Sequence, residues 1–325
     1  MLSKDDLIEY FHSGELKEYP IYLEVRPLSF QYENSDILDT RPLTLSLSKY
    51  VTKGLLTPKK SLEEWASELD IDEYEIFAEG LCEETVRNIK REVSWFKKKF
   101  TLVKVEGYSF LAEYLTSNNF NELIKYNEKE ASKLIKRINE FLEECIEAVC
   151  EVEEIDGIMV LENLVGFKTL RYRGAFIAKY FVPQLTELAI IARKADKIPV
   201  FHSPGNILLL SDLTRLMTVY RGIHPLTLRQ LSSFEEYISY TKVLKKLVDK
   251  IPTAILMTGL FPEILRQKIK RDDFRDLAKR WIQEIKEFKV ILSTTRELPK
   301  EFFESKVVND KIDIIKRLKR LRSLE

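Results

Sequence analysis

Three short apolar runs that end in polar residues decide the fold: GIMVLEN at residues 157–163, IPVFHSPGN at 198–206 and GIHPL at 222–226. Each run lies between stretches of helical periodicity, which is typical of a buried strand in a parallel sheet. The polar residues at their ends are Glu162, Asn163, His202, Asn206 and His224. Because α/β barrels build their active sites at the carboxyl ends of the strands, the three runs predict such a barrel and such a site.

Strand and helix patterns alternate along the rest of the chain. Further strands are predicted at residues 20–25, 73–81, 101–107, 253–259 and 289–295. Helical patterns are found at residues 3–12, 61–70, 84–100, 131–149, 174–194, 208–218, 232–249 and 271–287, and the basic tail is expected to be the closing helix. A polar loop is expected between the first strand and residue 40. Eight strands, each preceded by a helical stretch, favour a (β/α)8 TIM barrel over an open doubly wound sheet, with residues 1–325 as one domain.

The composition favours a cytoplasmic protein, and we expect its partner to be a small-molecule substrate. The 52 basic and 52 acidic residues are mixed and give zero net charge, which does not favour nucleic acid or an anionic membrane as a partner. No apolar run is long enough to suggest a membrane span, and the first residues do not resemble a secretion signal. Three cysteines without paired spacing predict a reducing compartment and no disulfide, with Cys145 in the core. The abundance of Lys, Glu and Ile is compatible with a thermophile.

Six segments occur in the order and at the spacing of one known superfamily: EGYSFLAEYL, GIMVLENLVGFKT, YFVPQL, IPVFHSPGNI, GIHPL and GLFPEIL. From about residue 84 to the end, the chain resembles the uroporphyrinogen decarboxylase superfamily, which also contains zinc-dependent corrinoid methyltransferases. The resemblance implies a (β/α)8 barrel and, because dimers are usual there, a possible homodimer.

The resemblance also implies several site residues. PIYLEVR is similar to the decarboxylases' first strand, and IDEYEIFAEGL is similar to the segment that ends in their SDIL, which would put Glu79 in the place of the catalytic aspartate. Tyr114 matches a substrate-facing tyrosine. A literal SDIL at residues 35–38 follows Arg26 so closely that we interpret it as a coincidence.

The chain departs from both named enzyme groups. The decarboxylases' pair of arginines is reduced to Arg26, and their histidine after the last strand is replaced by a segment that contains Thr294 and Arg296. The methyltransferases' zinc ligands, His-x-Cys and a second cysteine, are also missing, because His202 is followed by Ser203 and Pro204. Thiolates hold zinc in that mechanism, so we expect no metal here.

The candidate residues fall into groups by chemistry. His202, His224 and Glu79 are predicted to be acid–base groups, because imidazoles and carboxylates transfer protons near neutral pH. Arg26, Lys168 and Arg296 are predicted to bind substrate carboxylates, and ordinary ion pairs are the alternative. The remaining predicted substrate contacts are Tyr114, Glu162, Asn163 and Asn206. A metal set of Glu162 with the two histidines is a further alternative.

The leading hypothesis is a decarboxylase-like enzyme that acts, without a cofactor, on a carboxylate-bearing and possibly tetrapyrrole substrate. A methyltransferase of the same superfamily is the second hypothesis. The third is a barrel that has lost catalysis and binds a tetrapyrrole or a corrinoid protein.

Overall fold

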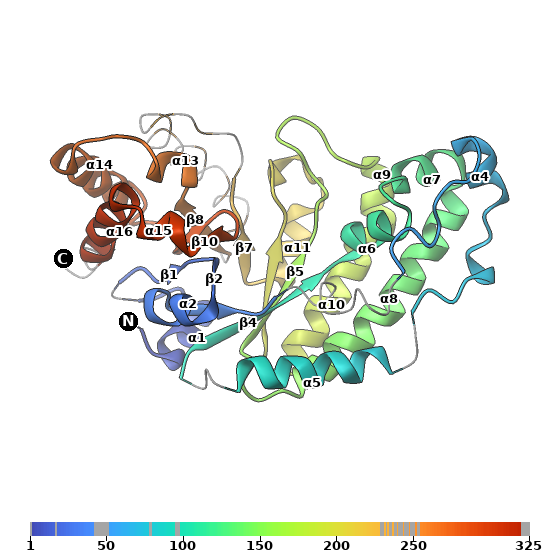
Figure 1. The fold of residues 1–325 in the computed structure, drawn as a ribbon, viewed down its shortest axis with the longest axis horizontal. Helices are drawn as coiled ribbons and strands as arrows, with labels where there is room; N and C mark the ends of the chain where they lie inside the picture. The colour runs from blue at the N-terminus through green and yellow to red at the C-terminus, as the bar shows by residue number, and fades with distance from the viewer. Residues whose placement is uncertain are drawn as a thin grey trace.

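The computed structural model describes residues 2–16, 18–41, 52–77, 80–94, 98–227 and 254–319, with single residues between 231 and 251. Within them, eight parallel strands form a nearly closed barrel in the order β1-β9-β8-β7-β6-β5-β4-β3 (Figure 1). The strands are β1 (Ile21–Tyr22), β3 (Ile37–Asp39), β4 (Phe100–Glu106), β5 (Gly157–Leu161), β6 (Ile198–His202), β7 (Gly222–His224), β8 (Ile255–Leu260) and β9 (Val290–Thr294). Between the edge strands, the Asp36 N–H donates to the Ile21 carbonyl at 2.8 Å. The predicted (β/α)8 fold is confirmed.

Helices surround the barrel, with α5, α8 and α10 on one side and α14, α15 and α16 on the other (Figure 1). The helices are α1 (Lys4–Ser13), α2 (Leu28–Asn34), α4 (Leu62–Glu68), α5 (Leu81–Val93), α6 (Tyr108–Leu115), α7 (Phe120–Tyr126), α8 (Glu128–Cys150), α9 (Gly174–Phe176), α10 (Val182–Lys194), α11 (Leu213–Val219), α13 (Pro262–Leu265), α14 (Arg271–Glu284), α15 (Lys300–Glu304) and α16 (Lys306–Leu318). Short 3-10 turns span Ile71–Glu73 and Ile207–Leu209, and a π turn spans Ile177–Phe181. A separate pair joins β2 (Val25–Arg26) to β10 (Leu298–Pro299).

Among the described residues, the stretch Gly174–Lys194 is long and apolar enough to cross a membrane, with a mean hydropathy of 1.3. In the most apolar 18-residue window of this stretch, 44% is buried inside the protein. Its α10 part packs against α8 and β6, where a barrel helix lies. Its apolar character is compatible with a helix that packs on the barrel core.

The barrel interior is apolar at its amino-terminal end. Phe100, Leu102, Met159 and Val200 pack there with residues of α1, and Phe11 of that helix stacks on Phe100 with ring centroids 5.2 Å apart. Because side chains alternate along a strand, the next inward position after Phe100 and Leu102 on β4 is Lys104. The apolar layers therefore give way to charged and polar side chains toward the carboxyl ends.

The second barrel strand lies in a different segment from the one predicted. The prediction of a strand at residues 73–81 is wrong, because a 3-10 turn ends at Glu73 and α5 begins at Leu81. The second strand is β3, which lies in the predicted polar loop and includes part of the SDIL that we interpreted as a coincidence. The seven-residue helix α2 makes the crossover from β1, so the strand comes much earlier than a crossover of ordinary length would allow.

Other boundaries differ less from the predictions. The predicted strand at residues 20–25 divides into β1 and β2, and the predicted helix at 84–100 begins at Leu81 and ends at Val93, so that β4 starts at Phe100. The predicted N-cap at Ser61 is present, since its hydroxyl accepts from the Glu64 N–H at 3.3 Å and donates to the Glu64 carboxylate at 2.8 Å. The predicted helix at 232–249 lies almost wholly outside the described residues.

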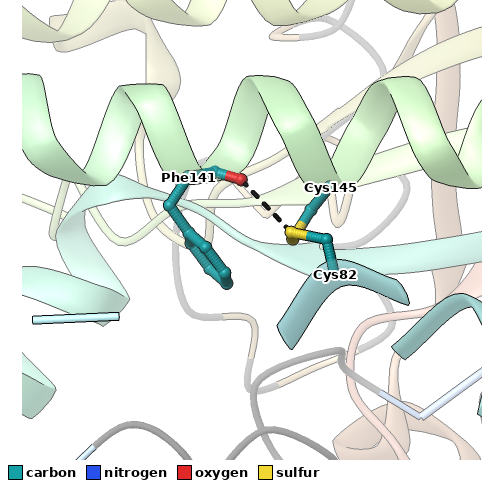
Figure 2. Close-up of a disulfide and its surroundings, with 3 residues drawn as sticks. All are labelled: Cys82, Phe141 and Cys145. Carbon is teal, nitrogen blue, oxygen red and sulfur yellow. Dashed lines mark hydrogen bonds between the residues drawn. A yellow bond between two sulfur atoms is a disulfide. The ribbon is translucent and has the colours of Figure 1, made fainter. Parts of the chain in front are cut away.

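A disulfide joins Cys82 of α5 to Cys145 of α8, and Figure 2 shows it beside Phe141. The prediction of unpaired cysteines is wrong. Sequence spacing does not reveal the pair, because the two cysteines lie 63 residues apart on helices that meet only in the fold. In the chain-entropy model, closing a loop of this length stabilises the fold by about 4 kcal/mol. Cys145 is buried in the core, as predicted.

Lys311 anchors the closing helix α16 to the end of α13. Its buried ammonium donates to the carbonyls of Ile264 at 3.1 Å, Leu265 at 3.0 Å and Gln267 at 2.5 Å. Because the substitution removes three hydrogen bonds from one buried charged group, Lys311→Met should lower the free energy of unfolding by about 2–3 kcal/mol. Urea denaturation measures this. Lys306→Met, an exposed change on the same helix, is the control and should shift stability by less than about 0.5 kcal/mol; equal effects would contradict the anchoring role.

Candidate active site

A buried ion cluster lies at the carboxyl ends of the first three barrel strands. The Lys104 ammonium contacts a carboxylate oxygen of Asp39 and lies 2.5 Å from Glu24 Oε1. On the far side of Asp39, the guanidinium of Arg26 donates to both carboxylate oxygens, at 3.2 and 3.4 Å. Lys104, Glu24 and Asp39 are each at most 3% exposed, so each charge depends on its partners to offset the loss of water.

The cluster keeps its charges despite burial. Burial opposes the charge of Lys104, but Asp39 and Glu24 outweigh it and raise the Lys104 pKa. Burial likewise opposes the charge of Asp39, and Lys104 and Arg26 outweigh it and lower the Asp39 pKa. Gln31 of α2 fixes the position of Asp39: its side-chain amide donates to that carboxylate and to the Leu23 carbonyl at 2.6 Å.

His202 and His224 end neighbouring strands, and their imidazoles face each other. Their Nδ1 atoms are 3.0 Å apart. On its other side, His224 Nε2 lies 3.0 Å from the Thr294 carbonyl oxygen and 3.6 Å from Glu24 Oε2. Thr294 also holds the backbone at Glu24, because its hydroxyl accepts from the Glu24 N–H at 2.8 Å. The histidine pair is thus joined to the ion cluster through Glu24.

The contacts fix which nitrogens carry protons in the neutral pair. A carbonyl oxygen only accepts, so His224 Nε2 must carry the hydrogen that faces Thr294. His224 Nδ1 is then an acceptor, and His202 Nδ1 must donate to it. His202 Nε2 is left with a free lone pair. Among the described residues, this atom has no hydrogen-bond partner. It is also absent from the buried polar atoms that lack a partner, so it must be accessible to solvent on the partly exposed residue.

The electrostatic surroundings keep both imidazoles neutral. Burial, followed by His224 and Lys104, lowers the pKa of His202 well below its usual 6.5. Burial also lowers the pKa of His224, although Glu24 opposes this. The arrangement therefore presents a neutral base, His202 Nε2, backed by a second imidazole and a carboxylate.

The Glu162 carboxylate binds the start of α6 and does not contact the histidine pair. It accepts from the backbone N–H groups of Tyr108 at 2.7 Å and Ser109 at 3.0 Å, and also from the Ser109 hydroxyl. It therefore caps the start of α6, where a carboxylate is favourable. Burial raises its pKa to about 7, while the bonds from Ser109 and Tyr108 oppose that shift.

Within the described part of the chain, none of the other predicted residues forms a hydrogen bond or ion pair with either histidine. The Asn163 N–H donates to the Ser109 hydroxyl at 2.8 Å, and the Asn206 side chain accepts from the Leu208 N–H at 3.3 Å. Tyr114 is half-buried on α6, where it packs against the outer core. Two more are exposed cations: Lys168 lies in the short hairpin between Val165 and Leu170, and Arg296 pairs with Glu263 at 3.2 Å. Glu79 lies outside the described residues.

Sequence reasoning missed Glu24, Asp39 and Lys104. A signal for Lys104 does exist, because it is the single basic residue in the apolar strand TLVKVEG and shares the inward face with Leu102. Asp39 was missed together with its strand. Glu24 was read as part of a continuous strand, although it lies between β1 and β2.

The residues present do not fit the metal set of Glu162, His202 and His224. Both Glu162 oxygens are engaged by the start of α6, and the two Nδ1 atoms face each other with room for one hydrogen only. His224 Nε2 is engaged by a carbonyl. Within the part of the chain that the structure describes, no group of three or more His, Cys, Asp or Glu side chains is arranged to hold a metal ion.

No protein-family model and no curated protein matches the sequence. Among solved structures, the chain is similar to a methyltransferase from Methanosarcina mazei at 12% identity and a TM-score of 0.58, over 97% of each chain. It is also similar to a B12-independent methionine synthase from Shewanella sp. W3-18-1, at 12% identity and a TM-score of 0.41, over 73% of this chain and 65% of that one. A third similar structure is an endo-β-1,4-mannanase from Thermotoga petrophila, at 9% identity and a TM-score of 0.49, over 96% of this chain and 78% of that one. We draw nothing from the two scores below 0.5. The first likeness extends over nearly the whole chain and shows that the fold is a TIM barrel.

Proposed function

We propose that the chain is a methyltransferase-type enzyme of the uroporphyrinogen decarboxylase superfamily, in which His202 removes a proton from the methyl acceptor. The observation that carries the proposal is the free lone pair on His202 Nε2, which follows from the contacts of His224 with Thr294 and with His202. An acceptor thiol or amine becomes a stronger nucleophile when a positioned base takes its proton.

The proposed step is a proton transfer coupled to methyl transfer. His202 Nε2 takes the acceptor's proton, and the electron pair left on the acceptor forms a bond to the methyl carbon. The bond between that carbon and the donor breaks, and its electron pair leaves with the donor. The positive charge on His202 is shared with His224 through the 3.0 Å contact between their Nδ1 atoms, and Glu24 stabilises it 3.6 Å from His224 Nε2.

Two further observations support this function. A solved structure that matches with a TM-score of 0.58 is named as a methyltransferase, and the likeness covers 97% of both chains. The six sequence segments that resemble the superfamily include the two that contain His202 and His224. The thiolate zinc ligands of the superfamily's methyltransferases are absent from the matching positions, so acceptor activation falls to the imidazole.

Decarboxylation is the second candidate, because the same segments resemble the decarboxylases. That reaction needs a proton donor at the carbon left behind, whereas neutral His202 carries no proton on Nε2. It also needs cations for the substrate carboxylates, but Arg26 is paired with Asp39, Arg296 is paired with Glu263, and Lys168 lies on an exposed hairpin. We therefore place decarboxylation second.

Paired assays on the purified chain separate the two reactions. In one, methylcobalamin is the donor and a panel of small thiols and amines are the acceptors, and mass spectrometry detects the methylated product. In the other, uroporphyrinogen is supplied and chromatography follows the loss of carboxylates. We expect methylated product and no loss of carboxylates. Loss of carboxylates without methyl transfer to any acceptor would overturn the proposal in favour of the second candidate.

A further inference from the structure

A cleft of about 350 Å³ lies between the first turns of α14 and α16, away from the histidine pair. Its walls come from the segments that follow β8 and β9, the seventh and eighth strands of the barrel. In Figure 1, α14 and α16 lie together on the outer side of the barrel. Many TIM barrels bind phosphate with the loops after strands seven and eight, although that site lies nearer the barrel axis.

The cleft carries an excess of positive charge. Lys268, Lys270, Arg271 and Lys306 line it, are exposed, and form no ion pair with any residue that the structure describes. Asp310 is the single carboxylate among the lining residues. A cleft lined by one sign of charge attracts ligands of the opposite sign, and the Arg271 guanidinium can donate two hydrogen bonds to a phosphate.

Both helices begin at the cleft without a side-chain cap. Lys270 precedes α14 and Ser305 precedes α16, and neither side chain accepts a bond from the first turn of its helix. The first N–H groups of a helix carry partial positive charge and favour an anion. The N–H groups at the start of α16 add to the charge of the four cations, whereas α14 already carries Asp272 and Asp273 in its first turn.

The floor of the cleft is apolar. Ile269, Phe274, Val307 and Ile314 line it, and Val307 is 38% exposed, which is unusual for so apolar a side chain. Lys311 adds no free charge, because its ammonium is engaged by the carbonyls at the end of α13. The cleft therefore has a cationic rim over an apolar floor, and its volume is near the lower end of the about 300–1,000 Å³ that ligand sites span.

We propose that this cleft binds a small phosphate ester with an apolar body, with the phosphate held by Lys268, Lys270, Arg271 and Lys306 and the apolar part against Phe274 and Val307. The site is separate from the histidine pair, so the proposal does not depend on the reaction at His202. A free ester and a lipid headgroup share the phosphate chemistry, and the experiment separates these sources.

The test is calorimetric titration of the purified chain with hexyl phosphate, inorganic phosphate and hexanol, together with sedimentation with vesicles that contain phosphatidic acid. We expect hexyl phosphate to bind more tightly than either fragment, and more weakly as salt is raised. Changing Lys270 and Lys306 to Gln should weaken binding at least about tenfold. Lys279→Gln, an exposed change farther along α14 and outside the cleft, should leave binding unchanged.

Val307→Asn tests the apolar floor separately. It should weaken the binding of hexyl phosphate and leave that of inorganic phosphate unchanged, because only the ester has an apolar body. The proposal is overturned if hexyl phosphate does not bind, or binds equally well after the Lys270 and Lys306 changes. Capture on vesicles without binding of free hexyl phosphate would also overturn it and would indicate a membrane-facing surface.

Discussion

Replacing Lys104 by methionine is expected to lower the free energy of unfolding by about 3–5 kcal/mol. The ammonium is the shared partner of the Asp39 and Glu24 carboxylates, and all three side chains are almost wholly buried. Without it, Asp39 keeps Arg26, but Glu24 is left with a neutral imidazole as its nearest partner. Removing one partner of a buried ion pair destabilises a fold far more than replacing both partners by apolar side chains, because the remaining charge is buried without compensation. Urea denaturation at pH 7 measures the change.

Two further variants show whether the cost comes from the stranded charge. Adding Glu24→Gln to Lys104→Met removes the unpaired carboxylate and should recover part of the lost stability, so the two effects should not add. Lys60→Met breaks an exposed pair with Glu68 and should change stability by about 1 kcal/mol or less. If Lys104→Met lowered stability no more than Lys60→Met, the ion cluster would not stabilise the fold.

The extent to which the fold could be predicted depends on strand length and burial. Strands β5, β6, β8 and β9 each have five or six residues and are almost wholly apolar, so they stand out from the helical patterns on either side. Strand β3 has three residues, and its register depends on Gln31 and on pairing with β4, neither of which leaves a periodic pattern. The disulfide was also beyond sequence reasoning, since it depends on where α5 and α8 meet.

The candidate site was predictable only in part, for a related reason. His202 and His224 could be found because polar residues at strand ends stand out after apolar runs. Lys104 lies inside a strand, where a charged residue is usually taken to face outward, and its inward direction follows only from its register with Leu102. Glu162 was predicted as a substrate contact because it ends a strand. Its role as a cap on α6 depends on the contact between β4 and β5, which places the start of that helix beside it.

His202→Gln is expected to lower the rate of methyl transfer about 10²–10⁴-fold, the usual contribution of a general base. Only the neutral imidazole can accept the proton, so activity is lost as pH falls through the pKa of His202. Burial, His224 and Lys104 lower that pKa well below 6.5, so the acidic limb of the wild-type pH–rate profile should lie well below pH 6.5. Rates measured across the acidic range test both the size of the loss and the position of the limb.

Three matched variants separate a proton relay from a merely structural pair. His12→Gln, an exposed change on α1, should leave the rate unchanged. His224→Gln should lower the rate less than His202→Gln, because it leaves the base in place but removes the group that shares its charge. Lys104→Met, assayed where it stays folded, removes a positive charge that lowers the pKa of His202, so its acidic limb should move to higher pH. A limb that stayed in place would mean that the charge cluster does not control the base, and the proposed mechanism would lose its link to Lys104.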